Sequence, residues 1–169
     1  MIRREKRIRR GVADNQRVER QRGFQRFQGL FIKAHGGFVH GEWESLCDGC
    51  GKCCLEKLVF EDDESLAFTN VACALLDPHT CRCRHYATRQ KYIPECIQLR
   101  PDDIEEYYWL PKTCAYRLLA EKKPLPDWHP LKTGNPQSVH QAGMSAQDRT
   151  VPPKSAEELQ DYIVDWDDL

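Results

Sequence analysis

Nine cysteines are the residues of this sequence best suited to chemistry, and all of them lie between residues 47 and 114. Four of them fall in the run CDGCGKCC at residues 47–54. The two-residue spacing lets neighbouring sulfurs face one metal ion from a single turn, and Gly49 and Gly51 allow the backbone to turn tightly. The candidate metal ligands are therefore Cys47, Cys50, Cys53, Cys54, Cys73, Cys81, Cys83, Cys96 and Cys114.

The spacing of the run leaves the identity of the metal open. Its C-x2-C-x2-C portion equals the first three ligands of the bacterial ferredoxin run, although the x3-C-P that should follow is absent. A structural zinc ion and an iron–sulfur cubane both take four cysteines. Nine thiols would supply two such sites with one left over, or one site and free thiols. Because adjacent thiols do not easily serve one tetrahedral ion, Cys54 is expected to bind a second metal, to bridge, or to be a small buried apolar residue.

The downstream cysteines form two further patterns. Cys81 and Cys83 have a strand-like spacing that would put both sulfurs on one face of an extended segment. Cys114 follows Thr113, the predicted N-cap of a short helix, and a thiolate near a helix N-terminus has a lowered pKa, which suits a ligand or a nucleophile. A nucleophile would also need a base and an orienting group in reach, and the sequence identifies neither, so no catalytic residue is assigned.

Histidines and basic side chains near the cysteines are weaker signals. His79, His85 and His129 could be ligands, but we expect them to be satisfied polar residues at the surface. Basic residues interleaved with the cysteines would offset the negative charge of a four-thiolate site, although solvated surface charge is the simpler expectation. These residues are Lys52, Lys57, Arg82, Arg84, Arg89 and Lys91.

The cysteines are expected to be reduced. Residues 1–26 are polar almost throughout, whereas a secretory signal needs an apolar run of about 7 to 15 residues. No stretch approaches the roughly 20 apolar residues of a membrane span. The odd number of cysteines also disfavours a closed disulfide framework. We therefore predict a cytoplasmic protein without a membrane partner, whose thiols bind metal.

The net charge of −1 hides an uneven distribution. Residues 1–40 carry +8 and residues 41–169 carry −9. A basic arm could bind phosphate backbones, but it lacks the regular aromatic interleaving that stacks bases, so a disordered solvated arm is favoured and a nucleic-acid partner is not expected. Apolar residues at helical spacing also allow a short amphipathic helix near 24–33.

The length of 169 residues fits one domain, which we assign to residues 41–169. Hydrophobic residues make up 40% of the chain and charged residues 30%, so the apolar supply is below that of a typical domain and metal binding is expected to support the core. The predicted fold class is a small, loop-rich α+β domain with a few short strands around the cysteines. Short helices are expected near 61–67, 102–108, 114–121 and 156–166, the last opened by a capping box at 155–158.

These motifs together resemble the CxxCxxCC cysteine-cluster family of zinc- or iron-chelating domains, and within it the bacterial UPF0260 (YcgN-like) branch. The resemblance covers residues 42 to 165, whereas the basic arm does not resemble the family. Its motifs are EWESLCDGCG at 42–51 with Cys53 and Cys54, FTNVAC at 68–73, Thr80 and Cys81 with Cys83, Arg84 and Tyr86, WLP at 109–111, TCAYRLLAE at 113–121, and Leu125 and Pro126 with WHPL at 128–131.

The resemblance implies metal chelation of undetermined chemistry. It favours the run at 47–54 with Cys73, Cys83 and Cys96 as ligands, because the broader family shares these, whereas Cys81 and Cys114 resemble features of the branch. A relative thought to carry an iron–sulfur cluster, with the ferredoxin-like spacing, puts such a cluster slightly ahead of zinc. A metalloenzyme or enzyme accessory factor, and a zinc-stabilised interaction module, are the alternative functions.

Overall fold

A β-hairpin that starts directly behind the cysteine run forms the centre of the sheet. The computed structural model describes residues 2–4, 40–155 and 157–169. Strands β2 and β3 are antiparallel, and β1 pairs with β2 on its other edge. In chain order the elements are β1 (Ile2–Arg4), α2 (His40–Ser45), η2 (Lys52–Cys54), β2 (Leu55–Phe60), β3 (Leu66–Ala72), η3 (Tyr86–Thr88), α3 (Arg89–Tyr92), η4 (Pro101–Glu106), α4 (Ala115–Ala120), α5 (Pro130–Thr133), α6 (Ser138–Gln141) and η5 (Leu159–Tyr162), where η marks a 3-10 helix.

The acidic stretch 61–64 forms the turn of this hairpin. The Phe60 N–H donates to the Ser65 carbonyl (3.0 Å), and the Asp63 carboxylate accepts the N–H of Ser65 (2.9 Å). Glu64 takes a left-handed conformation with φ of 56°. The helix predicted at 61–67 is therefore wrong. An aspartate that bonds the backbone two residues on stabilises a turn, and acidic residues alone do not distinguish that turn from a helix start.

Strand β2 is buried on both faces and separates two parts of the interior. Alternate residues of a strand point to opposite faces. Lys57 and Val59 line a cavity on one face, whereas Leu58 packs on the other with Val71 and Leu159. Strand β2 therefore separates the cavity from the cluster of Leu58, Val71 and Leu159. The cysteine run directly precedes β2 and lies at the cavity.

The largest apolar cluster lies between α2, η4 and α4. Trp43 and Tyr116 pack ring against ring at a centroid distance of 4.7 Å, and the Tyr116 hydroxyl donates to the Trp43 carbonyl (3.1 Å). A second cluster lies behind the cysteine run and contains Leu55 and Leu76. The first cluster contains Trp43, Leu46, Ile104, Tyr107, Trp109, Leu110, Ala115, Tyr116, Leu118, Leu119 and Leu125.

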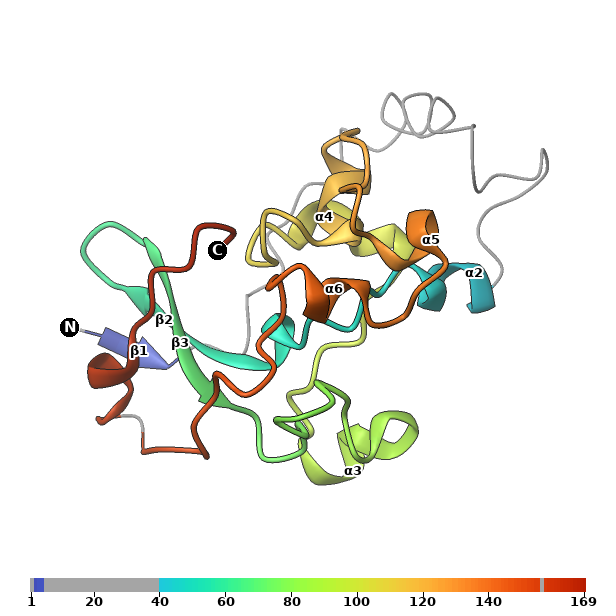
Figure 1. The fold of residues 1–169 in the computed structure, drawn as a ribbon. Coiled ribbons are helices and arrows are strands. Elements are labelled where there is room, and N and C mark those ends of the chain that lie inside the picture. The colour runs from blue at the N-terminus through green and yellow to red at the C-terminus, as the bar shows by residue number, and fades with distance from the viewer. Residues whose placement is uncertain (1, 5–39, 156) are drawn as a thin grey trace.

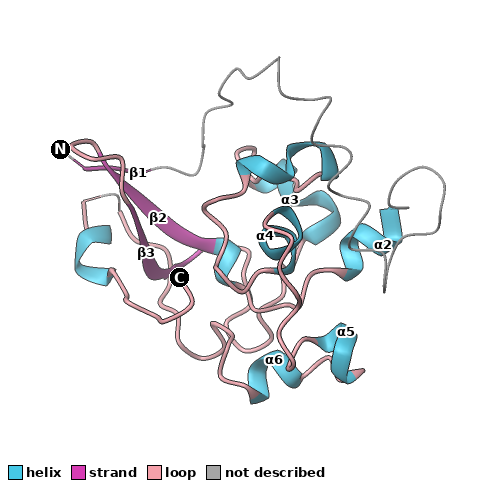
Figure 2. Ribbon diagram, turned by 90° about the horizontal axis from the view of Figure 1, so that it is seen from above, coloured by secondary structure: helices cyan, strands magenta, loops and turns pink. Residues whose placement is uncertain are grey.

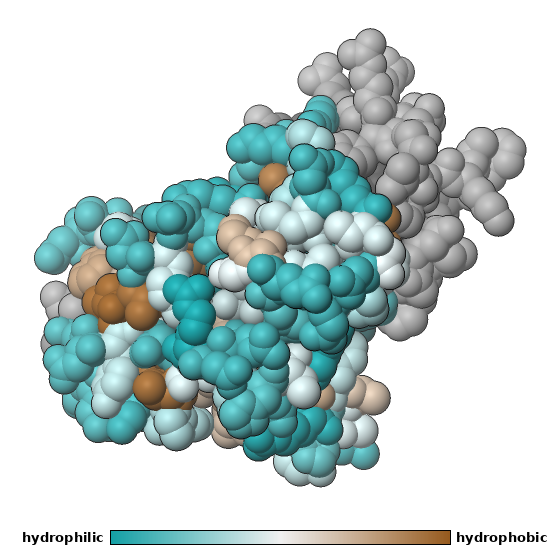
Figure 3. Space-filling model, in the orientation of Figure 1, coloured by the Kyte–Doolittle hydropathy of each residue, from teal (hydrophilic) through white to brown (hydrophobic). Residues whose placement is uncertain are grey.

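The sheet lies at one end of the described chain and most of the short helices at the other (Figures 1 and 2). Hydrophilic residues cover most of the face seen in Figure 3, and hydrophobic residues appear there as small separate patches. Apolar side chains on this face are thus scattered, as is normal for a protein surface. The described helices are too short and too polar to cross a membrane.

The predicted α+β, loop-rich class is confirmed, and two of the predicted helices form. The segment predicted at 114–121 is α4, and the one predicted at 102–108 is the 3-10 helix η4. Residues 1 and 5–39, which include the possible helix at 24–33 and nearly all of the basic arm, lie outside the described residues.

The helix predicted at 156–166 shrinks to the single turn η5. The Glu158 carboxylate accepts the Ser155 N–H (2.9 Å), which is one half of the expected capping box. The chain then leaves the helix, because Ile163 forms a bridge with Thr69 of β3 and the Val164 N–H donates to the Phe68 carbonyl (2.9 Å). Pairing with β3 thus replaces the expected helical hydrogen bonds.

The C-terminal residues fasten two loops that carry cysteines. The buried ammonium of Lys52, which lies inside the cysteine run, pairs with both carboxylate oxygens of Asp168. The same carboxylate accepts the Thr113 hydroxyl (3.0 Å), and the Asp168 carbonyl accepts the Lys112 N–H (2.8 Å). Asp168 therefore holds the cysteine run to the loop before Cys114, and we call this set of contacts the C-terminal clasp.

We expect Asp168→Asn to lower the free energy of unfolding by about 3 kcal/mol or more, because it leaves the Lys52 ammonium buried without its counter-charge. Urea unfolding of the intact chain measures this. The exposed neighbour Asp167→Asn removes the same formal charge and serves as the control. The double variant Lys52→Met with Asp168→Leu should recover most of the loss, since an apolar pair replaces the buried ions. Equal effects of the two asparagine variants would contradict the clasp.

Candidate metal centre

Eight of the nine cysteines line one cavity of about 180 Å³. They come from five separate stretches of the chain, and apolar side chains such as Leu55, Leu76 and Ile97 form much of the remaining wall. The eight cysteines are Cys47, Cys50, Cys53, Cys54, Cys73, Cys83, Cys96 and Cys114.

The cysteine run turns as tightly as its glycines predict. Gly49 and Gly51 take left-handed conformations with φ of 81° and 75°, and the run then closes into the 3-10 turn η2. The Asp48 carboxylate accepts the Cys50 N–H at 2.9 Å and fixes the first bend. These features bring the thiols of the run to the wall of the cavity.

Cys81 packs against the back of this run. A Cβ atom placed on Gly51 would lie 2.9 Å from Cys81 Cβ, and one on Gly49 would lie 3.0 Å from the guanidinium of Arg82. Cys81 is 5% exposed, belongs to the second apolar cluster and has φ of 55°. The extended conformation expected for the C-x-C pair is therefore wrong at Cys81, and only Cys83 of the pair lines the cavity.

The remaining cysteines are placed by backbone contacts. The Cys73 N–H, just after β3, donates to the Cys54 carbonyl (2.9 Å). Cys83 forms an antiparallel bridge with Leu76. Cys114 itself, rather than the predicted Thr113, is the N-cap residue of α4. Thr113 instead turns its hydroxyl to the C-terminal clasp.

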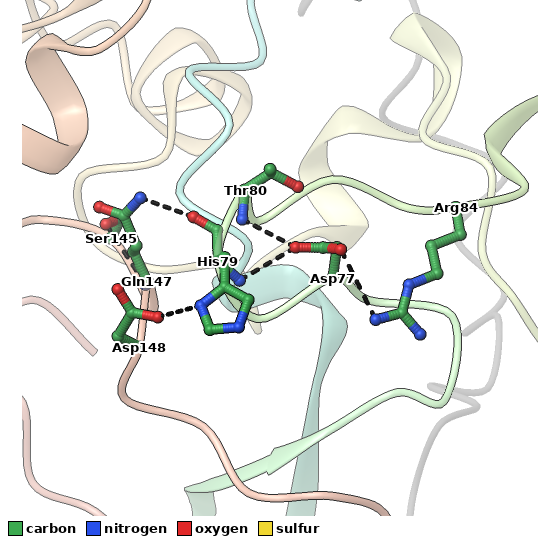
Figure 4. A network of polar contacts seen from close by, with 7 residues as sticks. All are labelled: Asp77, His79, Thr80, Arg84, Ser145, Gln147 and Asp148. Carbon is green, nitrogen blue, oxygen red and sulfur yellow. Dashed lines mark hydrogen bonds and ion pairs between the residues drawn. The ribbon is translucent and has the colours of Figure 1, made fainter.

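A polar network on the surface holds the turn that leads into Cys81 and Cys83 (Figure 4). The Asp77 carboxylate accepts the N–H groups of His79 (3.0 Å) and Thr80 (2.9 Å). His79 Nδ1 lies 2.5 Å from Asp148 Oδ1, and the Gln147 side chain donates to the His79 carbonyl (2.6 Å). His79 is exposed and already bonded to a carboxylate, so it is a satisfied surface residue as predicted.

His129 is also satisfied, but it is fully buried rather than at the surface. Its Nδ1 accepts the Leu131 N–H (3.1 Å), so its Nε2–H is free to donate to the Leu46 carbonyl (3.3 Å). Burial lowers the pKa of His129 and favours this neutral form. The histidine therefore anchors the residue immediately before Cys47.

A tyrosine and an arginine form part of the rim. The Tyr86 hydroxyl donates to the Glu44 carboxylate (2.5 Å), which links η3 to α2 across the chain. The Arg89 guanidinium lies 4.1 Å from the centre of the Tyr86 ring and donates to the Tyr86 carbonyl (2.6 Å). All three residues line the cavity, so polar groups stand beside its apolar and thiol wall.

Lys57 lines the cavity, so for this residue solvated surface charge, the simpler expectation from the sequence, is wrong. Its side chain is 6% exposed, and Nζ donates to the carbonyls of Leu55 (2.7 Å) and Cys53 (3.1 Å). Nζ also lies 5.1 Å from the ring of Phe68 and 5.3 Å from that of Trp109. Carbonyl dipoles and aromatic faces therefore stabilise the Lys57 ammonium beside the thiols.

Most cavity thiols are hard to ionise without a metal. Burial raises the pKa of Cys50 well above the usual value and that of Cys47 to about 12, and burial also raises the pKa of Cys114. Cys53 is the exception, with a pKa lowered to about 7 by a hydrogen bond with Cys54 and by the nearby Lys57 charge. A bound cation would lower the raised pKa values of the buried thiols, because it favours the thiolate form, and its binding would release protons.

The donor set fits a thiophilic metal, although the thiols stand apart. The sulfurs of Cys53 and Cys54 are 3.9 Å apart. Two thiolates on one tetrahedral metal at 2.3 Å would be about 3.8 Å apart, so this separation is compatible with one shared metal and with two neighbouring centres. Within residues 2–4, 40–155 and 157–169, no three Cys, His, Asp or Glu side chains converge closely enough for a single ion. The cavity thiols are thus not gathered into a closed one-ion site.

One buried acceptor in the wall also lacks a partner. Asp48 Oδ2 is buried and has no hydrogen-bond partner among the described residues. It lies in the same wall as Cys47 and Cys50, whose thiol pKa values its charge raises. Sequence reasoning missed Asp48 and Asp168 because each acquires its role through burial or through contacts with distant segments.

Comparisons with known proteins agree with this location. A family model described as "Putative zinc- or iron-chelating domain" matches residues 46–115, which enclose all nine cysteines but stop short of the C-terminal clasp. The UPF0260 protein of Gluconobacter oxydans is 54% identical over 125 residues, 74% of this chain and 77% of the relative. Those of Granulibacter bethesdensis (125 residues, 74% and 75%) and Rhizorhabdus wittichii (127 residues, 75% and 87%) are each 56% identical. No solved structure matches the chain.

We expect Cys53 to be the first thiol alkylated in the reduced, metal-free protein. At pH 7 about half of Cys53 is thiolate, so iodoacetamide should modify it roughly tenfold faster than Cys96, whose pKa is raised. Peptide mapping by mass spectrometry at several pH values measures both rates. Lys57→Met should move the midpoint of the Cys53 profile to higher pH. Equal labelling of Cys53 and Cys96 at pH 7 would contradict this arrangement.

We expect Gly51→Ala to destabilise the protein more than Gly134→Ala. Both glycines have positive φ (75° and 69°), so each substitution carries a strain of about 1–2 kcal/mol. Only Gly51 has a neighbour within 3 Å, whereas a Cβ on Gly134 would meet nothing within 4 Å. Adding Cys81→Gly should recover part of the loss, because it removes the clashing Cβ. Urea unfolding compares the three variants, and equal losses at Gly51 and Gly134 would count against the contact.

Proposed function

This chain belongs to the UPF0260 protein family, and we propose that it binds a metal centre through the cysteines of the cavity, with an iron–sulfur cluster favoured over zinc. The observation that carries the proposal is that eight thiols from five stretches of the chain line one cavity. The proposed ligands are Cys47, Cys50, Cys53, Cys54, Cys73, Cys83, Cys96 and Cys114.

Electrostatics within the cavity support metal binding. Neighbouring sulfurs disfavour one another's ionisation, and the charges of Cys53 and Cys114 both raise the pKa of Cys50. Without metal these thiols stay protonated, whereas a bound cation would replace the protons and offset the repulsion between the thiolates. All nine cysteines are free thiols, which agrees with metal binding in a reducing compartment such as the cytoplasm.

Three features favour a cluster. The C-x2-C-x2-C spacing equals three ligands of the ferredoxin run. No three ligand side chains of the described residues converge on a single ion, whereas a cluster binds each thiolate to a different iron. Apolar residues in the wall would limit the access of water, which helps to protect a cluster.

This chain's own residues would then hold and tune the centre. Lys57 would offset the negative charge of the thiolates around Cys53, with which it already interacts. Asp48 would order the first bend of the run and supply its unpaired oxygen as an acceptor or further ligand. A bound iron–sulfur cluster would supply one-electron redox chemistry, and bound zinc would supply structural support.

Anaerobic purification followed by elemental analysis and an optical spectrum tests the proposal. We expect iron and inorganic sulfide bound to the protein, with broad visible absorbance. Zinc without that absorbance would overturn the cluster and leave metal binding in place. Absence of both metals from protein purified in this way, and after reconstitution with iron and sulfide or with zinc, would overturn the proposed function.

Removal of the metal should loosen the fold, because metal binding and folding are coupled at such sites. We expect a strong chelator to lower the thermal midpoint of unfolding and to reduce the near-ultraviolet circular dichroism of Trp109 and its neighbours at the cavity. Cys47→Ser with Cys50→Ser should show these changes without chelator. An unchanged midpoint after complete metal removal would show that the core does not depend on the centre.

A further inference from the structure

We infer that the eight cavity cysteines form two sets of four, so that one chain holds two neighbouring metal centres. This inference rests on the proposed function. The first set is Cys47, Cys50, Cys53 and Cys114. The second set is Cys54, Cys73, Cys83 and Cys96.

Ligand number is the first argument. A structural zinc ion takes four ligands and a cubane cluster takes four cysteines, so one centre would leave four thiols of the same cavity without a role. The ninth cysteine, Cys81, already has a packing role behind Gly51. Eight thiols therefore match two complete ligand sets.

The first set gathers on the side of the largest apolar cluster. Leu46, just before Cys47, belongs to that cluster, and Cys114 packs against it. Cys50, Cys53 and Cys114 share the cavity wall with Leu46, Leu110 and Ala115, which all belong to that cluster. Three ligands from a C-x2-C-x2-C run with a fourth from a distant segment is the arrangement of ferredoxin clusters.

The second set gathers around the second apolar cluster. Cys54 packs against that cluster, which contains Ala72 and Leu76. The Cys73 N–H donates to the Cys54 carbonyl (2.9 Å). The Leu76 N–H donates to the Cys73 carbonyl (2.9 Å), which closes a turn between these residues. Leu76 also forms an antiparallel bridge with Cys83.

Cys96 joins the second set through the end of α3. Its N–H donates to the Ile93 carbonyl (3.0 Å), and its carbonyl accepts the Gln90 side chain (3.3 Å). Cys96 lines the same cavity, and it is assigned to the second set because the C-x2-C-x2-C cysteines and Cys114 already supply four ligands to the first.

The adjacent pair Cys53 and Cys54 marks the boundary between the sets. Both lie in the 3-10 turn η2, where successive side chains are about 120° apart around the axis. Cys54 packs against the second cluster, whereas Cys53 is the third cysteine of the C-x2-C-x2-C spacing that forms the first set. Their sulfurs are 3.9 Å apart, so the two centres would be close neighbours. Adjacent cysteines thereby supply two centres from one turn.

Paired substitutions in the full-length protein test this division. Cys50→Ser with Cys114→Ser removes two ligands of the first set, and Cys73→Ser with Cys83→Ser removes two of the second. Cys81→Ser is the matched control outside the cavity. Each variant is purified anaerobically, and its iron, sulfide and zinc are measured per chain, with circular dichroism to report folding.

We expect wild type and Cys81→Ser to hold two centres, about eight iron atoms or two zinc ions. Each paired variant should retain about half of that metal. Complete loss in either folded variant, or one centre in the wild type, would overturn the division and leave the proposed function intact. If a paired variant does not fold, metal release from the wild type to a chelator decides: two phases of similar amplitude support two sets, and one phase counts against them. A wild type without metal would contradict the proposed function itself.

Discussion

The left-handed turn through Gly49 and Gly51 is the constraint on which the cysteine site depends. A Cβ on Gly49 would lie 3.0 Å from the Arg82 guanidinium, and one on Gly51 would lie 2.9 Å from Cys81 Cβ. Because glycine has no Cβ, the run can pack closely against the segment of Cys81 and Arg82. That close approach directs the thiols of the run to the cavity and leads Cys54 straight into β2. Because β2 is buried on both faces, the end of the run is fixed to a packed strand.

The site buries polar and ionisable groups, whose burial costs free energy unless a partner such as a metal ion compensates for it. Thiols with raised pKa values, a carboxylate oxygen without a partner and a buried ammonium share the same wall. Lys57 is tolerated there because carbonyl groups and two aromatic rings surround it. Lys52, by contrast, is matched by Asp168, and so serves the fold more than the cavity. Lys52 and Lys57 are both buried, but Lys52 forms an ion pair that holds the fold, whereas Lys57 lines the cavity.

The C-terminal residues support the site from outside the segment that the family model matches. The matched domain ends at residue 115, yet Asp168 joins the cysteine run to the loop before Cys114. Trp166 adds to this contact, with its ring 5.3 Å from Lys52 Nζ and 3.9 Å from the Arg149 guanidinium. A minimal cysteine domain would lack this support, so the remainder of the chain contributes to holding its loops.

Local patterns in the sequence determined the glycine turn of the run, the helix that follows Cys114, the loop-rich α+β class and the family. Each of these depends on residues close together in the chain or on motif spacing. The acidic residues at 61–64 and the capping box at 155–158 predicted longer helices than the structure contains. Their local hydrogen bonds form in a turn as well as in a helix.

Only the tertiary structure decided which thiols share a cavity. Cys81 and Cys83 are two residues apart, yet one packs behind Gly51 and the other lines the cavity, because a single left-handed residue breaks the expected alternation. The burial of His129, the placement of Lys57 between two rings and the pairing of Lys52 with Asp168 likewise come from contacts between distant segments. Spacing along a chain constrains which sulfurs can meet within one turn, and long-range packing determines which ones do.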